Sequence, residues 1–200
     1  MKGCKMREIW IIRHGLTDLN VSGVFFGTTD VSLNKAGQLQ AAQLRGRMPD
    51  MTFDLLLSSP LERAMQTARI ALPDVAFELE PALAERALGD WESLSLEEIR
   101  QRNTDHWDGW QADWKGFQPP GGESFADFWQ RVTAFLDALL ARTDWKRALL
   151  VSHAGPIRCL ITHGLQLPKD DVWRFSPDNA RLSCLKFNRE GYGWLSALNT

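Results

Sequence analysis

The stretch EIWIIRHG, residues 8–15, decides the fold that we predict for this chain. Its apolar run stops abruptly at Arg13, His14 and Gly15. Such a run, ended by a glycine, is typical of a short strand buried on both faces of a parallel sheet. Taken alone, the tripeptide also fits a strand end whose basic side chain reaches solvent, so the other predicted strand ends must decide between an ordinary end and a reactive site.

Further buried strands are predicted along the chain, and most of them are followed by a helix. The strand candidates are FDLLLSSP at 53–60, VAFELE at 75–80, RALLVSH at 147–153 and a closing pair, RLSCLKF and GYGWLSAL. Helices are predicted at 34–48, from Pro60 with Ser59 as its cap, at 96–103, at 124–142 and from Gly155-Pro156 to 165. Short strands that alternate with helices indicate an α/β fold whose mostly parallel sheet is covered on both faces.

Length, charge and cysteine content narrow the class of protein. Two hundred residues fit one domain, and 23 basic against 25 acidic residues give a net charge of −2. No global field favours nucleic acid or an anionic membrane. The amino-terminal residues indicate neither a signal peptide nor a membrane span. Three widely spaced cysteines, Cys4, Cys159 and Cys184, favour reduced thiols and hence a cytoplasmic protein.

Polar side chains follow four of the predicted strands, where a parallel sheet would gather them at one edge. They are Arg13, His14, Arg63, Glu85 and His153. Two histidines and a carboxylate could bind a metal, but the adjacent arginines argue against a cation. Arginine forks match phosphate oxygens, and the predicted helix starts would add backbone N–H donors at the same edge. The set therefore predicts a phosphoryl pocket.

Phosphoryl transfer in such a pocket needs a nucleophile, charge stabilisation and an acid for the leaving oxygen. A neutral imidazole is a competent nucleophile, and neighbouring arginines disfavour its protonated form. A carboxylic acid can protonate the departing oxygen and later, as carboxylate, activate water. This chemistry needs no metal and no cofactor.

Four ordered motifs carry a specific family resemblance that spans the chain. They are RHGLTDLN (13–20), SSPLERAxxTA (58–68), ExxxGDWE (85–92) and SHAGPIR (152–158). This pattern resembles the histidine phosphatase superfamily, whose members include the cofactor-dependent phosphoglycerate mutases. The resemblance implies a three-layer α/β/α sandwich of the phosphoglycerate mutase-like kind, often with one antiparallel strand.

The same resemblance implies a role for each strand-end residue. His14 would become phosphohistidine, while Arg13, Arg63 and His153 would hold the phosphoryl oxygens. Glu85 would be the proton donor and then the base. Further phosphate contacts are implied for the Asn20 side chain and for the backbone near Gly27 and Ala154.

Within the superfamily, the chain resembles the α-ribazole-5′-phosphate phosphatases of cobalamin synthesis. The likeness rests on length, on the GDWE segment, on a Trp-rich stretch and on GGES at 121–124. We predict a single domain, 1–200, with a cap-like insertion at about 93–123. Trp107, Trp110 and Trp114 would lie on one helical face, either as an aromatic wall for a ring or packed on the domain. Glu123 and Ser124 would contact substrate or cap a helix.

Three other functions compete with the metal-independent phosphomonoesterase that this pattern favours, whose partner is a small phosphomonoester. A broad-specificity sugar or nucleotide phosphatase would share the same centre. A phosphoglycerate mutase would need basic residues around a second phosphate, but the stretch 105–124 has one Lys and no Arg against four Asp or Glu. A non-catalytic phospho-ligand module would be expected to lack His14 or Glu85. The oligomeric state stays open.

Overall fold

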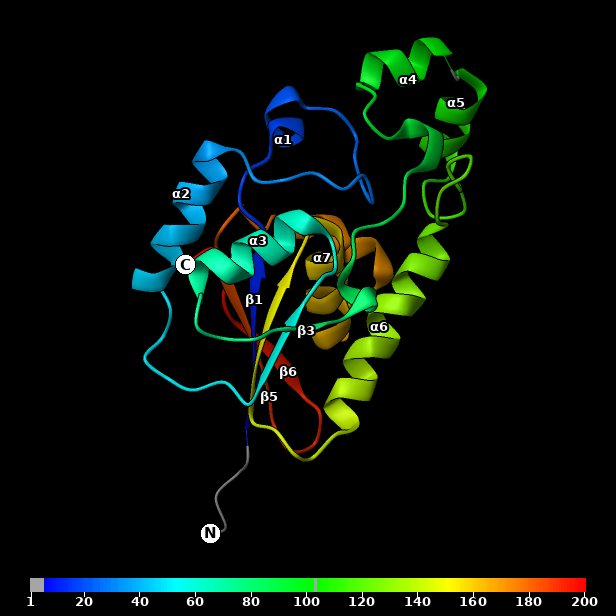
Figure 1. Cartoon of the computed structure of the whole chain (residues 1–200). Helices are drawn as coiled ribbons and strands as arrows, with labels where there is room; N and C mark the ends of the chain where they lie inside the picture. The colour runs from blue at the N-terminus through cyan, green and yellow to red at the C-terminus, as the bar shows by residue number, and fades with distance from the viewer. Residues whose placement is uncertain (1–5, 103) are drawn as a thin grey trace.

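A six-stranded sheet forms the centre of the computed structural model, which describes residues 6–102 and 104–200 (Figure 1). The strand order is β3-β2-β4-β1-β5-β6. The strands are β1 (Arg7–Arg13), β2 (Leu55–Ser58), β3 (Glu78–Leu79), β4 (Arg147–Ser152), β5 (Leu182–Phe187) and β6 (Gly193–Ala197). The first four strands in that order pair in parallel, and β5 runs antiparallel to both of its neighbours. The predicted mostly parallel sheet is confirmed.

Helices cover both faces of the sheet, as the sandwich prediction requires (Figure 1). The α-helices are α1 (Asp18–Ser22), α2 (Lys35–Gln43), α3 (Glu62–Ala71), α4 (Leu96–Arg102), α5 (Thr104–Ala112), α6 (Phe125–Ala141) and α7 (Ala154–Gly164). Short 3₁₀ turns are η1 (Leu44–Gly46), η2 (Pro81–Leu83), η3 (Gly89–Trp91) and η4 (Lys169–Arg174). Helices α6 and α7 pack on one face, and α2 and α3 pack on the other.

The alternation of side chains along β1 builds the two halves of the core. Ile9 and Ile11 join the cluster formed with α6 and α7, whereas Ile12 joins the cluster formed with α3. Burying each of these side chains contributes roughly 1.5–3 kcal/mol to folding. Arg13 pairs with Ser152 across the parallel ladder, so β1 and β4 end at the same height. His14 and His153, the next residues of each strand, therefore emerge side by side.

Three predicted elements differ in extent. Helix α3 begins at Glu62 rather than Pro60, because the Ser59 hydroxyl contacts His153 and Asp30 Oδ1 accepts the Glu62 N–H at 2.7 Å. The strand predicted at 75–80 pairs only through Glu78–Leu79, at the edge of the sheet. The cap-like insertion predicted at about 93–123 contains, besides the helix predicted at 96–103, the helix α5, whose tryptophans pack on Trp91.

Two of the three cysteines fall in the described part of the chain. Cys159 and Cys184 are both buried and both free, and Cys4 lies outside the described residues. Along residues 6–102 and 104–200, none of the helices combines the length and the apolar character that a membrane crossing requires.

Candidate active site

The predicted polar residues meet beyond the carboxyl ends of β1, β2 and β4. A cavity of about 360 Å³ opens there. Its polar lining comes from Arg13, His14, Asn20, Arg63 and Glu85, and Ala154 contributes its backbone at the start of α7. The rings of His14 and His153 are 5.0 Å apart between centroids, with His153 wholly buried behind this lining. The convergence expected from a parallel sheet is therefore realised.

His14 is held as a neutral imidazole with one free nitrogen. Its Nδ1 lies 2.7 Å from the carbonyl oxygen of Gly15. A carbonyl oxygen only accepts, so Nδ1 carries the hydrogen and Nε2 keeps its lone pair. Burial, together with the nearby guanidinium groups of Arg63 and Arg13, holds the pKa of His14 well below its ordinary value. An unprotonated, oriented Nε2 is the state that nucleophilic attack needs.

The requirement for glycine at position 15, after His14, comes from packing rather than from chemistry. A Cβ on Gly15 would lie 2.5 Å from the carbonyl oxygen of Gly37 in α2, so only glycine allows this approach. The Gly15 N–H donates to Thr67 Oγ1 at 3.0 Å. The carbonyl of His14 accepts from Asn179 Nδ2 at 2.8 Å. Backbone contacts on both sides thus fix the position of His14.

Arg63 is fully buried and connects the second histidine to the cavity. Its Nε donates to His153 Nδ1 at 3.1 Å, so His153 Nε2 carries the hydrogen and donates to Ser59 Oγ at 2.7 Å. Burial, then His14 and the two arginines Arg63 and Arg13, lowers the pKa of His153 well below its ordinary value. This histidine is therefore neutral and orients the Arg63 fork.

The Arg63 fork keeps hydrogens free for a ligand. Its Nη1 donates to Thr29 O at 2.9 Å and its Nη2 donates to Gly27 O at 2.5 Å. Burial lowers the pKa of Arg63 to about 10, so the group stays charged at neutral pH. A guanidinium has five N–H hydrogens, of which three are bonded here. The other two can meet phosphoryl oxygens.

Arg13 carries a buried donor that awaits a partner. Its Nη1 donates to Pro177 O at 2.8 Å. Its Nε is buried and has no hydrogen-bond partner within the described part of the chain. Buried donors are rarely left unpaired, and in a cavity lined by Arg63 an anionic oxygen would satisfy this one.

Glu85 lies where this arginine-lined cavity meets a second cavity, since it lines both. Its Oε1 accepts from the Arg86 N–H and its Oε2 accepts from the Gly155 N–H, each at 3.0 Å. A Cβ on Gly155 would lie 2.1 Å from Glu85 Oε1, which explains the glycine of the SHAGP motif. Two backbone donors thus orient this carboxylate between the two spaces.

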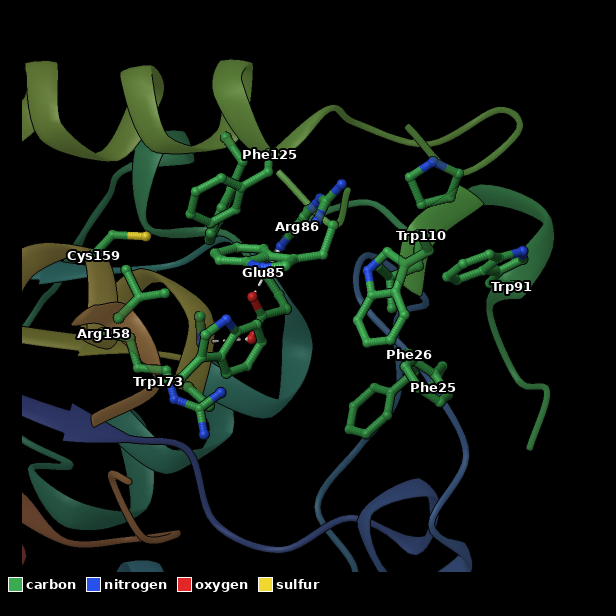
Figure 2. A pocket seen from close by; sticks show the side chains of 17 residues that line it. Phe25, Phe26, Glu85, Arg86, Trp91, Trp110, Phe125, Arg158, Cys159 and Trp173 are labelled. Atoms are coloured by element: carbon green, nitrogen blue, oxygen red, sulfur yellow. Dashed lines mark hydrogen bonds between the residues drawn. The ribbon is translucent and has the colours of Figure 1, made fainter. Parts of the chain in front are cut away.

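The second cavity, of about 220 Å³, is walled mainly by aromatic rings (Figure 2). Figure 2 shows Trp110, Phe25 and Phe26 on one side of Glu85 and Trp173 on the other. The Arg158 guanidinium lies over the Trp173 ring, 5.1 Å from its centroid. Such walls suit a flat, apolar leaving group.

The three predicted wall tryptophans do not share one helical face. Trp107 is only 6% exposed, packs against Trp91 and does not line the cavity. Trp110 lines it, and so does Trp114. Helix α5 ends at Ala112, so Trp114 sits in the following turn, where it contacts Trp173 at 5.5 Å between ring centroids.

The other predicted contacts divide between cavity and scaffold. Asn20 Oδ1 accepts from the Thr17 N–H at 3.1 Å, which leaves its amide nitrogen for a ligand. Gly27 is not part of the cavity lining and gives its carbonyl to Arg63, so its N–H contact stays a prediction. Glu123 pairs with Arg131 at 2.8 Å, and Ser124 caps α6. Ser124 therefore follows the capping alternative, whereas the Glu123 carboxylate is engaged in an ion pair instead.

Sequence reasoning missed several residues that support the site. They are Ser59, Thr67, Phe25, Phe26, Trp173 and Asn179. Ser59 and Thr67 stand inside the SSPLERAxxTA motif, which was a usable signal. Trp173 and Asn179 lie far from any motif, and only tertiary contact brings them to the site.

Acid should destabilise the protein as soon as ordinary histidines begin to protonate. The folded-state pKa values of His14 and His153 are lowered, so below the ordinary value of 6.5 the unfolded chain binds protons that the folded chain does not. Each histidine then removes up to about 1.4 kcal/mol of unfolding free energy per pH unit, until its folded-state pKa is reached. Urea unfolding between about pH 7.5 and pH 5.5 measures this slope.

The same titration in His14→Asn provides the matched comparison. Asparagine does not titrate, so this variant should lose about half of the acid slope. An unchanged slope in the variant would contradict the assignment of His14 as a buried neutral group.

The fold and site together define a phosphoryl-handling α/β enzyme with a buried histidine pair. A model of the histidine phosphatase superfamily (branch 1) matches residues 9–200. The chain belongs to this superfamily, and it is a hydrolase of phosphate monoesters.

The named relatives include both phosphatases and a mutase. An adenosylcobalamin/alpha-ribazole phosphatase of Escherichia coli (strain K12) is 34% identical over 96% of each chain. The crystal structure of the alpha-ribazole phosphatase from Shigella flexneri matches with a TM-score of 0.91, at 34% identity over 96% of each chain. A 2,3-bisphosphoglycerate-dependent phosphoglycerate mutase of Beijerinckia indica subsp. indica is 32% identical over 78% of this chain and 79% of its own.

Proposed function

We propose that the chain hydrolyses α-ribazole 5′-phosphate to α-ribazole and phosphate through a phosphohistidine at His14 Nε2, as part of cobalamin biosynthesis. The observation that carries this proposal is the position of Glu85 between an arginine-lined cavity and an aromatic one. The first cavity suits a phosphoryl group, and the second suits a ring such as benzimidazole. Two relatives at 34% identity are described as alpha-ribazole phosphatases, which supports this choice of substrate.

The first step forms the phosphohistidine. The lone pair of His14 Nε2 attacks phosphorus, while the bond from phosphorus to the ester oxygen breaks on the opposite side. Arg13 and Arg63 hold the equatorial oxygens, where charge is spread in the transition state. Glu85, as the acid, gives its proton to the departing alkoxide and becomes a carboxylate.

The second step reverses the proton path with water. The Glu85 carboxylate takes a proton from a water molecule that attacks phosphorus from the side vacated by the alcohol. The P–N bond breaks, and its electron pair returns to His14 Nε2. Inorganic phosphate leaves, and both residues recover their starting states. No metal ion takes part in these steps.

The rival functions differ in what lies beyond the phosphoryl cavity. A mutase must retain a second phosphate, whereas Arg86 and Arg158 are the only cations that line the aromatic cavity among the described residues. Arg86 is engaged by the carbonyls of Glu123 and Phe117, and Arg158 by that of Phe175. A broad-specificity phosphatase has no need of this aromatic wall. We therefore favour a substrate whose alcohol carries a ring. The free thiols of Cys159 and Cys184 favour a cytoplasmic setting for the reaction.

A substrate panel tests the proposal directly. Phosphate release in EDTA is measured for α-ribazole 5′-phosphate beside glucose 6-phosphate, a nucleotide and 3-phosphoglycerate. We expect kcat/KM to be at least about tenfold higher for α-ribazole 5′-phosphate, since one stacked ring contributes about 1–3 kcal/mol. Equal activity across the panel would favour the broad-specificity alternative, and loss of activity to EDTA would contradict the metal-free steps.

Trp110→Ala should reduce that preference while sparing the phosphoryl chemistry. The expected result is a drop of about tenfold in kcat/KM for α-ribazole 5′-phosphate and little change for glucose 6-phosphate. The matched control is Trp194→Ala, a half-buried tryptophan of β6 that is not part of either cavity lining.

A further inference from the structure

Glu92, the last residue of the GDWE motif, has no part in the steps above, yet its carboxylate is densely bonded. Its Oε1 accepts from the Thr28 N–H at 2.8 Å, from Thr28 Oγ1 at 2.9 Å and from the Leu88 N–H at 3.1 Å. Its Oε2 accepts from the Thr29 N–H at 2.5 Å and from Thr29 Oγ1. One half-buried carboxylate therefore ties residues 28 and 29 to the start of the cap segment.

The segment that Glu92 holds is the one that holds Arg63. The carbonyls of Gly27 and Thr29 accept from the two terminal nitrogens of Arg63, at 2.5 and 2.9 Å. Thr29 thus donates to Glu92 through its N–H and accepts from Arg63 through its carbonyl. If residues 27–29 shift, the Arg63 fork must shift with them, because they accept two of the three hydrogen bonds that the guanidinium donates within the described chain.

We propose that Glu92 is a positioning residue that fixes the Arg63 fork against the phosphoryl group by clamping residues 27–29. It does not touch the reacting atoms, and its negative charge also favours the buried guanidinium. Burial raises the pKa of Glu92, but the hydrogen bonds from Thr29, Leu88 and Thr28 outweigh it and leave the pKa lowered. The clamp is therefore ionised across the neutral range. This inference rests on the proposed role of Arg63 in phosphoryl binding.

The test substitutes the clamp and measures the phosphoryl cavity alone. Glu92→Gln keeps the shape of the side chain but turns one acceptor into a donor that faces N–H and O–H groups. We expect orthovanadate to inhibit hydrolysis of p-nitrophenyl phosphate about tenfold more weakly, with KM raised in parallel, because several charge-assisted bonds are lost. The matched control is Glu98→Gln, a capping-box carboxylate of α4 bonded to Ser95, which should leave both constants within about twofold.

A double substitution separates positioning from general destabilisation. In an Arg63→Lys background, Glu92→Gln should raise the orthovanadate inhibition constant by less than a further factor of about two, because the guanidinium fork on which Glu92 acts is gone. If the effects of the two substitutions on the inhibition constant multiply in the double variant, the proposal is overturned. Wild-type orthovanadate inhibition in a folded Glu92→Gln enzyme would also overturn it.

A milder variant guards against loss of fold in these substitutions. Thr28→Val removes one O–H donor at the surface and should weaken orthovanadate about two- to threefold. An unchanged inhibition constant in a folded Thr28→Val enzyme would count against the clamp. Orthovanadate does not report on the leaving group, so a wrong substrate assignment would leave these results unchanged.

Discussion

Replacing His14 by Ala should lower turnover at least about 10⁴-fold while the protein stays folded, because the reaction loses its nucleophile. Among the described residues, His14 Nε2 is the one ring nitrogen of the buried pair whose lone pair is not engaged, since His153 Nδ1 accepts from Arg63 and His153 Nε2 donates to Ser59. The variant also removes a group whose pKa burial lowers, so its loss should relieve acid destabilisation. Phosphate release and urea unfolding measure the two effects.

A chemical trap makes this prediction sharper. Wild-type enzyme quenched during turnover of ³²P-labelled substrate should carry acid-labile, base-stable label, and the His14→Ala enzyme should carry none. His163→Ala is the matched control, because that ring bonds Asp137 at 2.8 Å at the protein surface and should keep both label and turnover. Unchanged turnover in a folded His14→Ala enzyme would overturn the mechanism.

Glu85→Gln should separate substrates by the basicity of their leaving groups. An alkoxide must be protonated as it departs, so kcat for α-ribazole 5′-phosphate should fall about 10²–10⁴-fold. Nitrophenolate leaves without a proton, so the rate of phosphohistidine formation from p-nitrophenyl phosphate should fall less than about tenfold. The contrast arises because Glu85 lies between the two cavities, where the ester oxygen must sit.

Rapid-quench measurement of the first turnover distinguishes this step from the later attack of water. Glu98→Gln again serves as the control, since that carboxylate caps α4 at Ser95. Equal loss for both substrates would show that Glu85 acts on the phosphoryl group rather than on the leaving oxygen.

The fold followed from sequence where local pattern and tertiary environment agree. The continuous apolar run of β1 requires burial on both faces, and its polar ending marks the active edge. The sequence pattern did not predict structure where tertiary packing determines it. Helix α5 contains Gly109 and two bulky tryptophans, Trp107 and Trp110, which are held by Trp91 from a separate segment.

The phosphoryl half of the site was predictable, and the aromatic half was only partly so. Arg13 ends β1, and His14 and His153 directly follow β1 and β4, whose register is regular, so the sheet dictates that they meet. Trp173 reaches the second cavity from the short 3₁₀ turn η4 and Phe26 reaches it from an irregular segment, and the positions of both depend on contacts distant in sequence. Thr28 and Thr29 lie more than sixty residues before Glu92, so their hydrogen bonds to it could not be foreseen from the motif.

The arrangement of the two cavities around Glu85 also fixes the order in which products leave in the proposed reaction. The aromatic cavity holds the alcohol beside the only carboxylate that both linings share within the described chain, so the hydrolytic water and the alcohol compete for one place. The alcohol must depart before water can enter, and phosphate must be the last product to leave. Phosphate should therefore inhibit competitively with substrate, whereas free alcohol should divert the phosphoenzyme backwards into ester.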